Sequence, residues 1–138
     1  MKQQIVFQRE EELGIDEFRN ILIDSTLGER RPVNDPKRLS MMLRHANLIV
    51  TAREEGMLVG VARSLTDFSY CTYLSDLAVL KAYQKQGTGR ELIRQTKLLS
   101  PQAKLILLSA PAAVEYYPRI GMTRHEHCYY LDDVSALR

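Results

Sequence analysis

Two glycines end a polar segment past the middle of the chain, and their spacing suits the binding of a pyrophosphate. Residues 84–90 read Gln-Lys-Gln-Gly-Thr-Gly-Arg and lie between an apolar stretch and an amphipathic one. Glycine lets the backbone approach a ligand closely and adopt a positive φ. Free N–H groups in such a turn and at a helix start converge on one point, which the helix dipole makes positive. The segment is therefore a candidate anion-binding loop.

Two known phosphate loops do not match this segment. The Walker loop requires Lys and then Ser or Thr after its last glycine, whereas Gly89 is followed by Arg90 and Glu91. The dinucleotide fingerprint requires a third glycine at the position of Leu92, and it normally follows the first strand of a fold. A glycine-rich turn that binds no ligand stays open as an alternative.

Hydrophobic periodicity and turn residues predict the elements around this loop. The expected strands are a first one around residues 5–7, a hairpin of 48–53 and 57–65, a strand at 70–80, a strand at 104–108 buried on both faces, and one or two tail strands within 125–131. The expected helices are 15–26, one that Asp35 and Pro36 begin, one from Gly89 to Pro101, and 112–120. Strand, helix and strand across the loop predict a right-handed parallel crossover.

Alternation along residues 70–80 assigns side chains to faces of the sheet. Asp76 is expected to share one face with Leu74 and Ala78, and Leu77 to share the other face with Tyr73. The order of elements predicts an α+β fold with αβα layers around a mixed sheet.

Composition limits the function classes. The chain has 138 residues, is 45% hydrophobic and 26% charged, and carries a formal charge of +2, which predicts one domain spanning 1–138 with no nucleic-acid or membrane partner. It contains no run of about 18 apolar residues and no signal-peptide core at its start, so we expect a cytoplasmic protein. Cys71 and Cys128 have no metal-type spacing and are expected to be free thiols.

A second motif follows the strand expected at 104–108. Residues 116–122 read Tyr-Tyr-Pro-Arg-Ile-Gly-Met, and Gly121 suits a helix C-cap even without a ligand. The segment resembles motif B of the GCN5-related N-acetyltransferases (GNAT), an aromatic-Tyr-x-x-x-Gly-aromatic pattern in which Met122 takes the last aromatic position. Residues 84–89 resemble motif A of the same family, Arg/Gln-x-x-Gly-x-Gly/Ala after a strand. The resemblance covers about residues 5–131 and is most specific between Asp76 and Met122.

The resemblance implies a GNAT-type fold and a cosubstrate. The fold would have a mixed, mostly antiparallel sheet of about six or seven strands, a central β-α-β crossover and about four helices. The cosubstrate would be acetyl-CoA, with no metal. Its pantetheine arm would lie along the backbone of Leu77, Ala78 and Val79 like an added strand, where one N–H would polarise the thioester carbonyl. Its pyrophosphate would be held by backbone N–H groups of Gln84, Lys85, Gln86, Gly87, Thr88, Gly89 and Arg90. Lys85 and Arg90 are alternatively ordinary solvated cations.

The resemblance also implies catalytic roles. Tyr117 matches the family position whose hydroxyl serves as general acid toward the CoA thiolate, and its neighbour Tyr116 is expected in the core. Asp76, on a strand expected to be central, is a candidate base through a raised pKa, and alternatively a structural hydrogen-bond acceptor. Tyr73 and Glu115 are weaker candidates for the base, and some family members use none.

Other side chains leave alternatives open. Arg30 and Arg31 lie in a loop that borders the acceptor site in this family, so one of them contacts an acidic group of the acceptor or both are solvated. The pair His125 and His127 would share a strand face, which allows a zinc pair. A non-metal role is favoured because no third ligand stands at useful spacing. Motif B often carries an Asn that meets the pantetheine, and Ala110 stands at its position here. A homodimer through apolar edges and tail strands also stays open.

The sequence therefore predicts an N-acetyltransferase that moves an acetyl group from acetyl-CoA to a primary amine, preferably of a small molecule, in a ternary complex. A non-catalytic acyl-CoA-binding module is the alternative from another class, because fold does not fix function. A nucleotide-binding regulatory domain is a third alternative that rests on the glycine loop alone.

Overall fold

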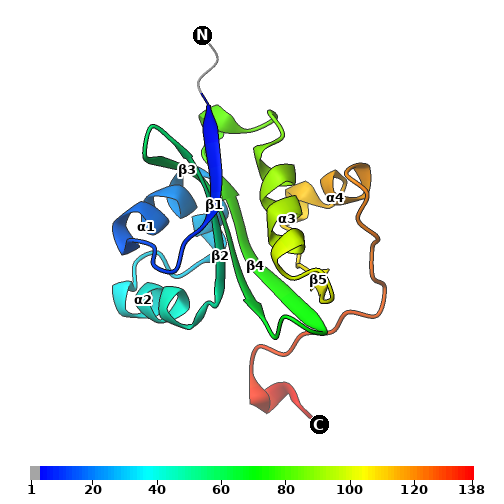
Figure 1. Ribbon diagram of the computed structural model, residues 1–138. Helices are drawn as coiled ribbons and strands as arrows, with labels where there is room; N and C mark the ends of the chain where they lie inside the picture. Colours follow the sequence, from blue (N-terminus) through cyan, green and yellow to red (C-terminus); the bar gives the residue numbers. More distant parts are fainter. Residues whose placement is uncertain (1–3) are drawn as a thin grey trace. The chain divides into compact units, whose positions relative to one another are not determined.

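The computed structural model describes residues 4–138 and places five strands in one sheet, in the order β1-β2-β3-β4-β5 (Figure 1). The strands are β1 (Ile5–Arg9), β2 (Leu48–Glu54), β3 (Met57–Thr66), β4 (Cys71–Val79) and β5 (Lys104–Ile106). The α-helices are α1 (Ile15–Asp24), α2 (Pro36–His45), α3 (Thr88–Leu99) and α4 (Tyr116–Arg119). Short 3-10 helices are η1 (Leu27–Arg30), η2 (Lys81–Tyr83), η3 (Pro111–Ala113) and η4 (Val134–Ala136). Within the described range, no helix has both the length and the apolar composition needed to cross a bilayer.

The chain forms two compact units, one that ends at Leu108 and one that spans Ser109–Arg138. The first unit contains the whole sheet with α1, α2 and α3. Its first four strands pair antiparallel with their neighbours, whereas β4 and β5 run parallel on either side of α3 in the chain. The predicted mixed sheet and its strand–helix–strand crossover are thereby confirmed.

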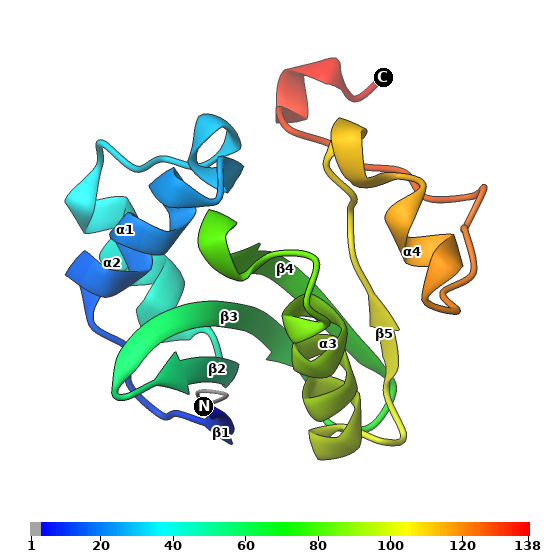
Figure 2. The same cartoon turned by 90° about the horizontal axis from the view of Figure 1, so that it is seen from above.

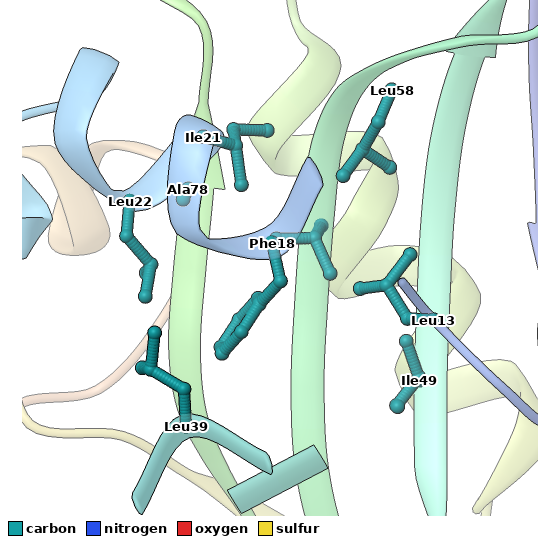
Figure 3. Packing of buried hydrophobic residues seen from close by; sticks show 9 residues of the cluster. Leu13, Phe18, Ile21, Leu22, Leu39, Ile49, Leu58 and Ala78 are labelled. Carbon is teal, nitrogen blue, oxygen red and sulfur yellow. The ribbon is translucent and has the colours of Figure 1, made fainter. Parts of the chain in front are cut away.

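Helices cover both faces of the sheet, with α1 and α2 on one face and α3 on the other (Figures 1 and 2). The α1/α2 cluster consists of buried side chains from those helices and the facing strands: Leu13, Phe18, Ile21, Leu22, Leu39, Ile49, Leu58, Val61 and Ala78. Figure 3 shows Leu22 of α1 and Leu39 of α2 pointing toward each other beside Phe18. The α3 cluster lies on the opposite face and consists of Leu48, Val50, Ala52, Val59, Ala62, Leu74 and Leu92.

Local signals explain where two helices are placed. The Asp35 carboxylate accepts a hydrogen bond from Arg38 N at 3.1 Å and Pro36 is the first residue of α2, as predicted. The start of α3 lies close to β3 because Gly60 has no side chain. A Cβ on Gly60 would come within 3.0 Å of Leu92 Cδ1 and 3.2 Å of Thr88 Cγ2. Gly60 therefore sets how near the helix start can approach the sheet.

A β-bulge in β4 changes which residues share a face. Arg63 of β3 pairs with Asp76, and the next β3 residue pairs with Leu74, so Ser75 is left without a partner of its own. Leu74 consequently packs in the α3 cluster, while Ala78 packs in the α1/α2 cluster. We predicted that Asp76 shares a face with Leu74. That prediction was wrong, because strict alternation holds only in a strand without an inserted residue.

The predicted strand count was too high and the last helix too long. No strand follows β5 in residues 107–138, where tail strands were expected. In the tail, His127 N donates to His125 Nδ1 at 2.9 Å, and such local bonds compete with a sheet ladder. The helix expected at 112–120 is reduced to η3 and α4, because Pro118 has no N–H to donate to Val114.

The final strand is also shorter and more exposed than expected. β5 ends at Ile106, which is 47% exposed, and Leu108 is 51% exposed. We expected residues 104–108 to be buried on both faces. β5 lies at the edge of the sheet, so only part of this segment is covered. Leu105 and Leu107 pack on the α3 cluster, which accounts for the apolar residues at these two positions.

Arg53 joins three separate parts of the first unit. Its guanidinium donates to Glu10 Oε1 at 3.0 Å and Oε2 at 2.8 Å, to Glu17 Oε1 at 2.7 Å and Oε2 at 2.9 Å, and to Gly56 O at 2.9 Å. Thr51 Oγ1 also donates to Glu10. The hydrogen bonds from Arg53 hold the pKa of both carboxyl groups below their ordinary value of 4.5.

These lowered pKa values predict an acid-sensitive fold. A depressed pKa stabilises the folded state above the unfolded pKa, and the stabilisation is lost as pH falls through the folded value. We expect Arg53→Gln to reduce the free energy of unfolding by about 1–2 kcal/mol near pH 7 and to flatten its decline below about pH 4.5, since the carboxylates are only partly screened. Urea unfolding at several pH values measures both effects.

Arg44→Gln is the matched control, because Arg44 occupies an exposed position of α2. It should leave the pH profile of the wild-type protein unchanged. A profile for Arg53→Gln that stays parallel to the wild type would contradict the role assigned to Arg53.

Candidate functional site

β4 has an edge that the sheet does not use. The parallel ladder with β5 ends at the pair Tyr73 and Ile106, so residues 74–79 have no strand partner on that side within the described range. On the other side, Leu80 N donates to Val59 O at 3.0 Å. Peptide groups of successive residues alternate in direction along a strand, so Leu77 directs its N–H and C=O away from β3. An extended ligand could pair with β4 at this edge.

The loop between β4 and α3 presents a row of backbone donors. In the part of the chain that the structure describes, the N–H groups of residues 85–90 have no protein acceptor, and the first N–H of this region that is bonded belongs to Glu91, at 3.0 Å from Gly87 O. Lys85 and Gly87 adopt positive φ values of 63° and 85°. Alternating left- and right-handed residues turn successive N–H groups toward one concave face, which is the geometry of an anion nest.

Gln84 connects this loop to the open edge of β4. Its side-chain Nε2 donates to Val79 O at 2.9 Å, and its backbone N donates to Lys81 O at 3.3 Å. Gln84 was predicted to supply a backbone donor to a phosphate. The structure gives its N–H an internal acceptor, so the row of available donors begins at Lys85.

Two acidic side chains anchor the start of the loop, and motif reasoning did not identify them. Asp24, the last residue of α1, accepts from Lys81 N at 2.8 Å. Glu54, the last residue of β2, accepts from the Tyr83 hydroxyl at 2.6 Å, and this hydrogen bond raises the pKa of Tyr83. No signal within residues 84–90 points to either anchor, because both partners lie far away in the sequence.

The charges around the loop favour an anion. α3 directs its positive dipole end toward residues 85–90, and the side chains of Lys85 and Arg90 are exposed there. Nothing comparable exists for a metal: within residues 4–138, no three side chains of His, Cys, Asp or Glu gather as a metal site requires. Orphan N–H groups, a helix dipole and two cations fit a pyrophosphate.

Asp76 is fully buried and both of its carboxylate oxygens are occupied. Oδ1 accepts from Arg31 Nε at 2.5 Å, and Oδ2 accepts from Arg63 Nε. Each oxygen therefore lies against a guanidinium on the α1/α2 face of the sheet. Of the two interpretations left open for Asp76, this geometry supports the structural acceptor.

Arg31 is likewise engaged within the protein. Its NH2 donates to Ser75 O at 2.7 Å and its NH1 to Arg30 O at 2.8 Å, in addition to the bond to Asp76. The sequence left two alternatives open for Arg30 and Arg31, namely contact of one of them with the acceptor or solvation of both. Arg30 is exposed, whereas every nitrogen of the Arg31 guanidinium has a protein acceptor.

Tyr117 lies in the second unit, within α4. Its ring packs edge-to-face against Tyr116, with centroids 5.2 Å apart, and its carbonyl accepts from Met122 N at 3.0 Å. Gly121 has a φ of 101°, as its predicted C-cap role requires. Tyr116 is 36% exposed, which corrects the expectation that it lies in the core.

The structure thus brings the edge at Leu77 and the donors at 85–90 together in one unit, through Gln84. Tyr117 and Glu115 belong to the other unit. Tyr73 is 37% exposed at the last pair of the parallel ladder.

Comparison with known proteins identifies related chains. The sequence model of the acetyltransferase (GNAT) domain family matches residues 26–137. A GNAT family acetyltransferase from Streptococcus pneumoniae TIGR4 superposes with a TM-score of 0.76 at 20% identity, covering 95% of this chain and 98% of that chain. An aminoglycoside N-acetyltransferase in complex with CoA has a TM-score of 0.74 at 12% identity, covering 97% of both chains.

A third similar structure is an aminoglycoside acetyltransferase from an uncultured soil metagenomic sample, in complex with sisomicin. It has a TM-score of 0.66 at 21% identity, covering 94% of this chain and 97% of that chain. At these identities the three structures establish the fold that the resemblance implied, with five strands here where six or seven were expected.

Gly87 provides a direct test of the loop geometry. A Cβ at Gly87 would meet no atom within 4 Å, so the cost of Gly87→Ala arises only from its positive φ. We expect a loss of about 1 kcal/mol in the free energy of unfolding, measured by urea denaturation. Gly87→Asn should lose less, because Asn tolerates the left-handed region. Equal losses for Ala and Asn would show that the loop does not require this conformation.

Proposed function

This chain belongs to the GNAT acetyltransferase family, and we propose that it transfers an acetyl group from acetyl-CoA to a primary amine in a ternary complex. The observation that carries the proposal is the continuity of two features in one unit. The unpaired edge of β4 at Leu77 leads, through Gln84, into the row of free N–H groups at residues 85–90. An extended thiol arm that ends in a pyrophosphate would match this order, with the arm along the edge of β4 and the pyrophosphate at residues 85–90.

The pyrophosphate, the pantetheine arm and the thioester of acetyl-CoA each have a complementary group in the first unit. The pyrophosphate would accept hydrogen bonds from the backbone of residues 85–90, where Lys85 and Arg90 add positive charge. The amides of the pantetheine arm would pair with the edge of β4 over Leu77 and Val79. The N–H of Leu77 would then donate to the thioester oxygen, which gains negative charge during transfer.

The transfer requires that one bond form and one bond break. The amine nitrogen attacks the thioester carbon, the carbon–sulfur bond breaks, and the sulfur leaves as a thiolate. We assign Tyr117 as the general acid that protonates this thiolate, on the basis of its position in motif B. The proton lost by the amine passes to solvent. Asp76 does not take it in this scheme, because both of its oxygens already accept from arginines.

The acceptor that we propose is the primary amine of a small molecule. Two of the similar structures are of aminoglycoside acetyltransferases. These neighbours support an amine on a small polar molecule as the first class to screen.

Titration calorimetry with acetyl-CoA, beside ATP and NAD, tests the proposed cosubstrate. We expect saturable binding of acetyl-CoA that ATP and NAD do not match, because only acetyl-CoA uses both the loop and the β4 edge. Binding without thiol release across a broad panel of amines would favour the non-catalytic acyl-CoA module. No binding of acetyl-CoA would contradict both functions.

Tyr117→Phe tests the acid. We expect kcat to fall by about 10²-fold or more with little change in the dissociation constant of acetyl-CoA, since the hydroxyl acts only on the departing thiolate. Thiol release at saturating acetyl-CoA measures this. Tyr116→Phe is the matched control, because it removes the neighbouring hydroxyl while both rings are kept. Equal effects of the two substitutions would argue against a specific role for Tyr117.

A further inference from the structure

Two arginines hold the bulge in β4. The Ser75 carbonyl accepts from Arg31 NH2 at 2.7 Å, and the Ser75 hydroxyl accepts from Arg63 NH2 at 3.0 Å. The next residue, Asp76, accepts from the Nε atoms of the same two arginines. Nε and NH2 of a guanidinium form a rigid fork, so each arginine spans the step from Ser75 to Asp76. We call these four residues the bulge clamp.

The bulge clamp joins elements on the α1/α2 face of the sheet to β4. Arg63 lies on β3, and its NH1 donates to Met42 O in α2 at 3.0 Å. Arg31 directly follows η1, in the loop that leads to α2, and its NH1 donates to Arg30 O at 2.8 Å. Through these bonds, the η1–α2 loop and α2 are fixed to one point of β4.

That point lies directly before the proposed thioester contact. The Leu77 N–H shares a planar peptide group with the Asp76 carbonyl, so the backbone torsions of Asp76 set its direction. The bulge at Ser75 also shifts the alternation of side chains between the two faces of the sheet. It lies two residues beyond Tyr73, which forms the last pair of the parallel ladder. Fixing Ser75 and Asp76 therefore fixes where the Leu77 N–H points.

The clamp also places charge at the same point. Two guanidinium groups face one carboxylate, which leaves a net positive charge. The side chains of Arg31, Arg63 and Asp76 are only 19%, 6% and 0% exposed, so water screens this charge weakly. A fixed positive charge behind a backbone donor favours negative charge on the oxygen that the donor contacts.

We propose that Arg31 is a positioning residue for acetyl transfer. Acting through the Ser75 carbonyl and Asp76, it sets the direction of the Leu77 N–H and makes that direction depend on the η1–α2 loop. The inference rests on the proposed function, and it differs from both alternatives that the sequence left open for Arg31, contact with the acceptor and solvation. The fork is essential to it, because the compact ammonium of a lysine cannot span both Asp76 Oδ1 and Ser75 O.

The test uses Arg31→Lys and Arg31→Gln, with Arg53→Lys as the matched control. Arg53 also holds several acceptors with one fork, but its partners are Glu10, Glu17 and Gly56. The measurements are the melting temperature, the dissociation constant of CoA, kcat with the best amine of the panel, and amide hydrogen exchange of Asp76 in the free protein. The exchange measurement requires neither cosubstrate nor acceptor.

We expect Arg31→Lys to bind CoA within about twofold of the wild type, because the loop at 85–90 is untouched, while kcat falls about tenfold or more. Arg31→Gln should lose further activity. In both variants the Asp76 amide should exchange about tenfold faster, because the bulge opens locally. Arg53→Lys should lower the melting temperature but leave kcat and Asp76 exchange unchanged.

Other outcomes separate this inference from the proposed function. Wild-type values of kcat and Asp76 exchange in Arg31→Lys would overturn the role of Arg31 even if the enzyme is active. A kcat that falls in proportion to lost stability in both Arg31→Lys and Arg53→Lys would also overturn it. If the wild type fails to bind CoA, the proposed function fails, and Asp76 exchange alone decides whether Arg31 holds the bulge. Should Arg31→Gln not fold, Arg31→Lys carries the test.

Discussion

β4 pairs with β3 from Thr72 to Val79, interrupted only at the Ser75 bulge, but it pairs with β5 over only three residues, and the rest of the site depends on this asymmetry. A strand in the interior of a sheet normally finds acceptors and donors on both edges, because unpaired peptide groups are costly when buried. The bulge at Ser75 and the early end of β5 interrupt that pairing. What remains is a stretch of backbone that is rigidly held by β3 and still able to bond outward.

The first unit contains two ion-pair clusters in which the ratio of arginines to carboxylates is reversed. On β2, one arginine serves two carboxylates, Glu10 and Glu17, near the surface. On β4, two arginines serve one buried carboxylate, Asp76. Burying an ion pair has a large desolvation cost, so such a group is a weak source of stability and a strong source of unique geometry where the remaining bonds are satisfied. The polar atoms of the Ser75 side chain and carbonyl satisfy that condition here.

Sequence reasoning succeeded where the determinants are local. The hairpin of β2 and β3, the start of α2 at Asp35 and Pro36, and the crossover around residues 84–90 depend on periodicity, caps and glycines that lie within each segment. The family was identified from two short motifs for the same reason. The roles of Tyr117 and of the loop N–H groups stay predictions.

What the sequence could not show depends on residues far apart in the chain. No glycine or proline at Ser75 indicates the bulge in the sequence. Arg31, which donates to the Ser75 carbonyl, lies 44 positions away. Asp76 looked like a candidate base because its arginine partners cannot be recognised without the strand pairing. The prediction of tail strands failed for a different reason. Residues 125–131 carry polar and aromatic side chains without the apolar alternation that would bury one face of a strand.

The hydrogen bonds that anchor the loop between β4 and α3 have one more consequence. Lys81 and Tyr83 are fastened to Asp24 and Glu54, which belong to the first half of the chain. The residues of the loop motif therefore do not include all the residues that hold the loop. A fragment that begins after the β2–β3 hairpin would contain every motif residue but neither Asp24 nor Glu54. Because these two hydrogen bonds come from α1 and β2, the loop would keep them in another protein only if acidic residues stood at both distant positions.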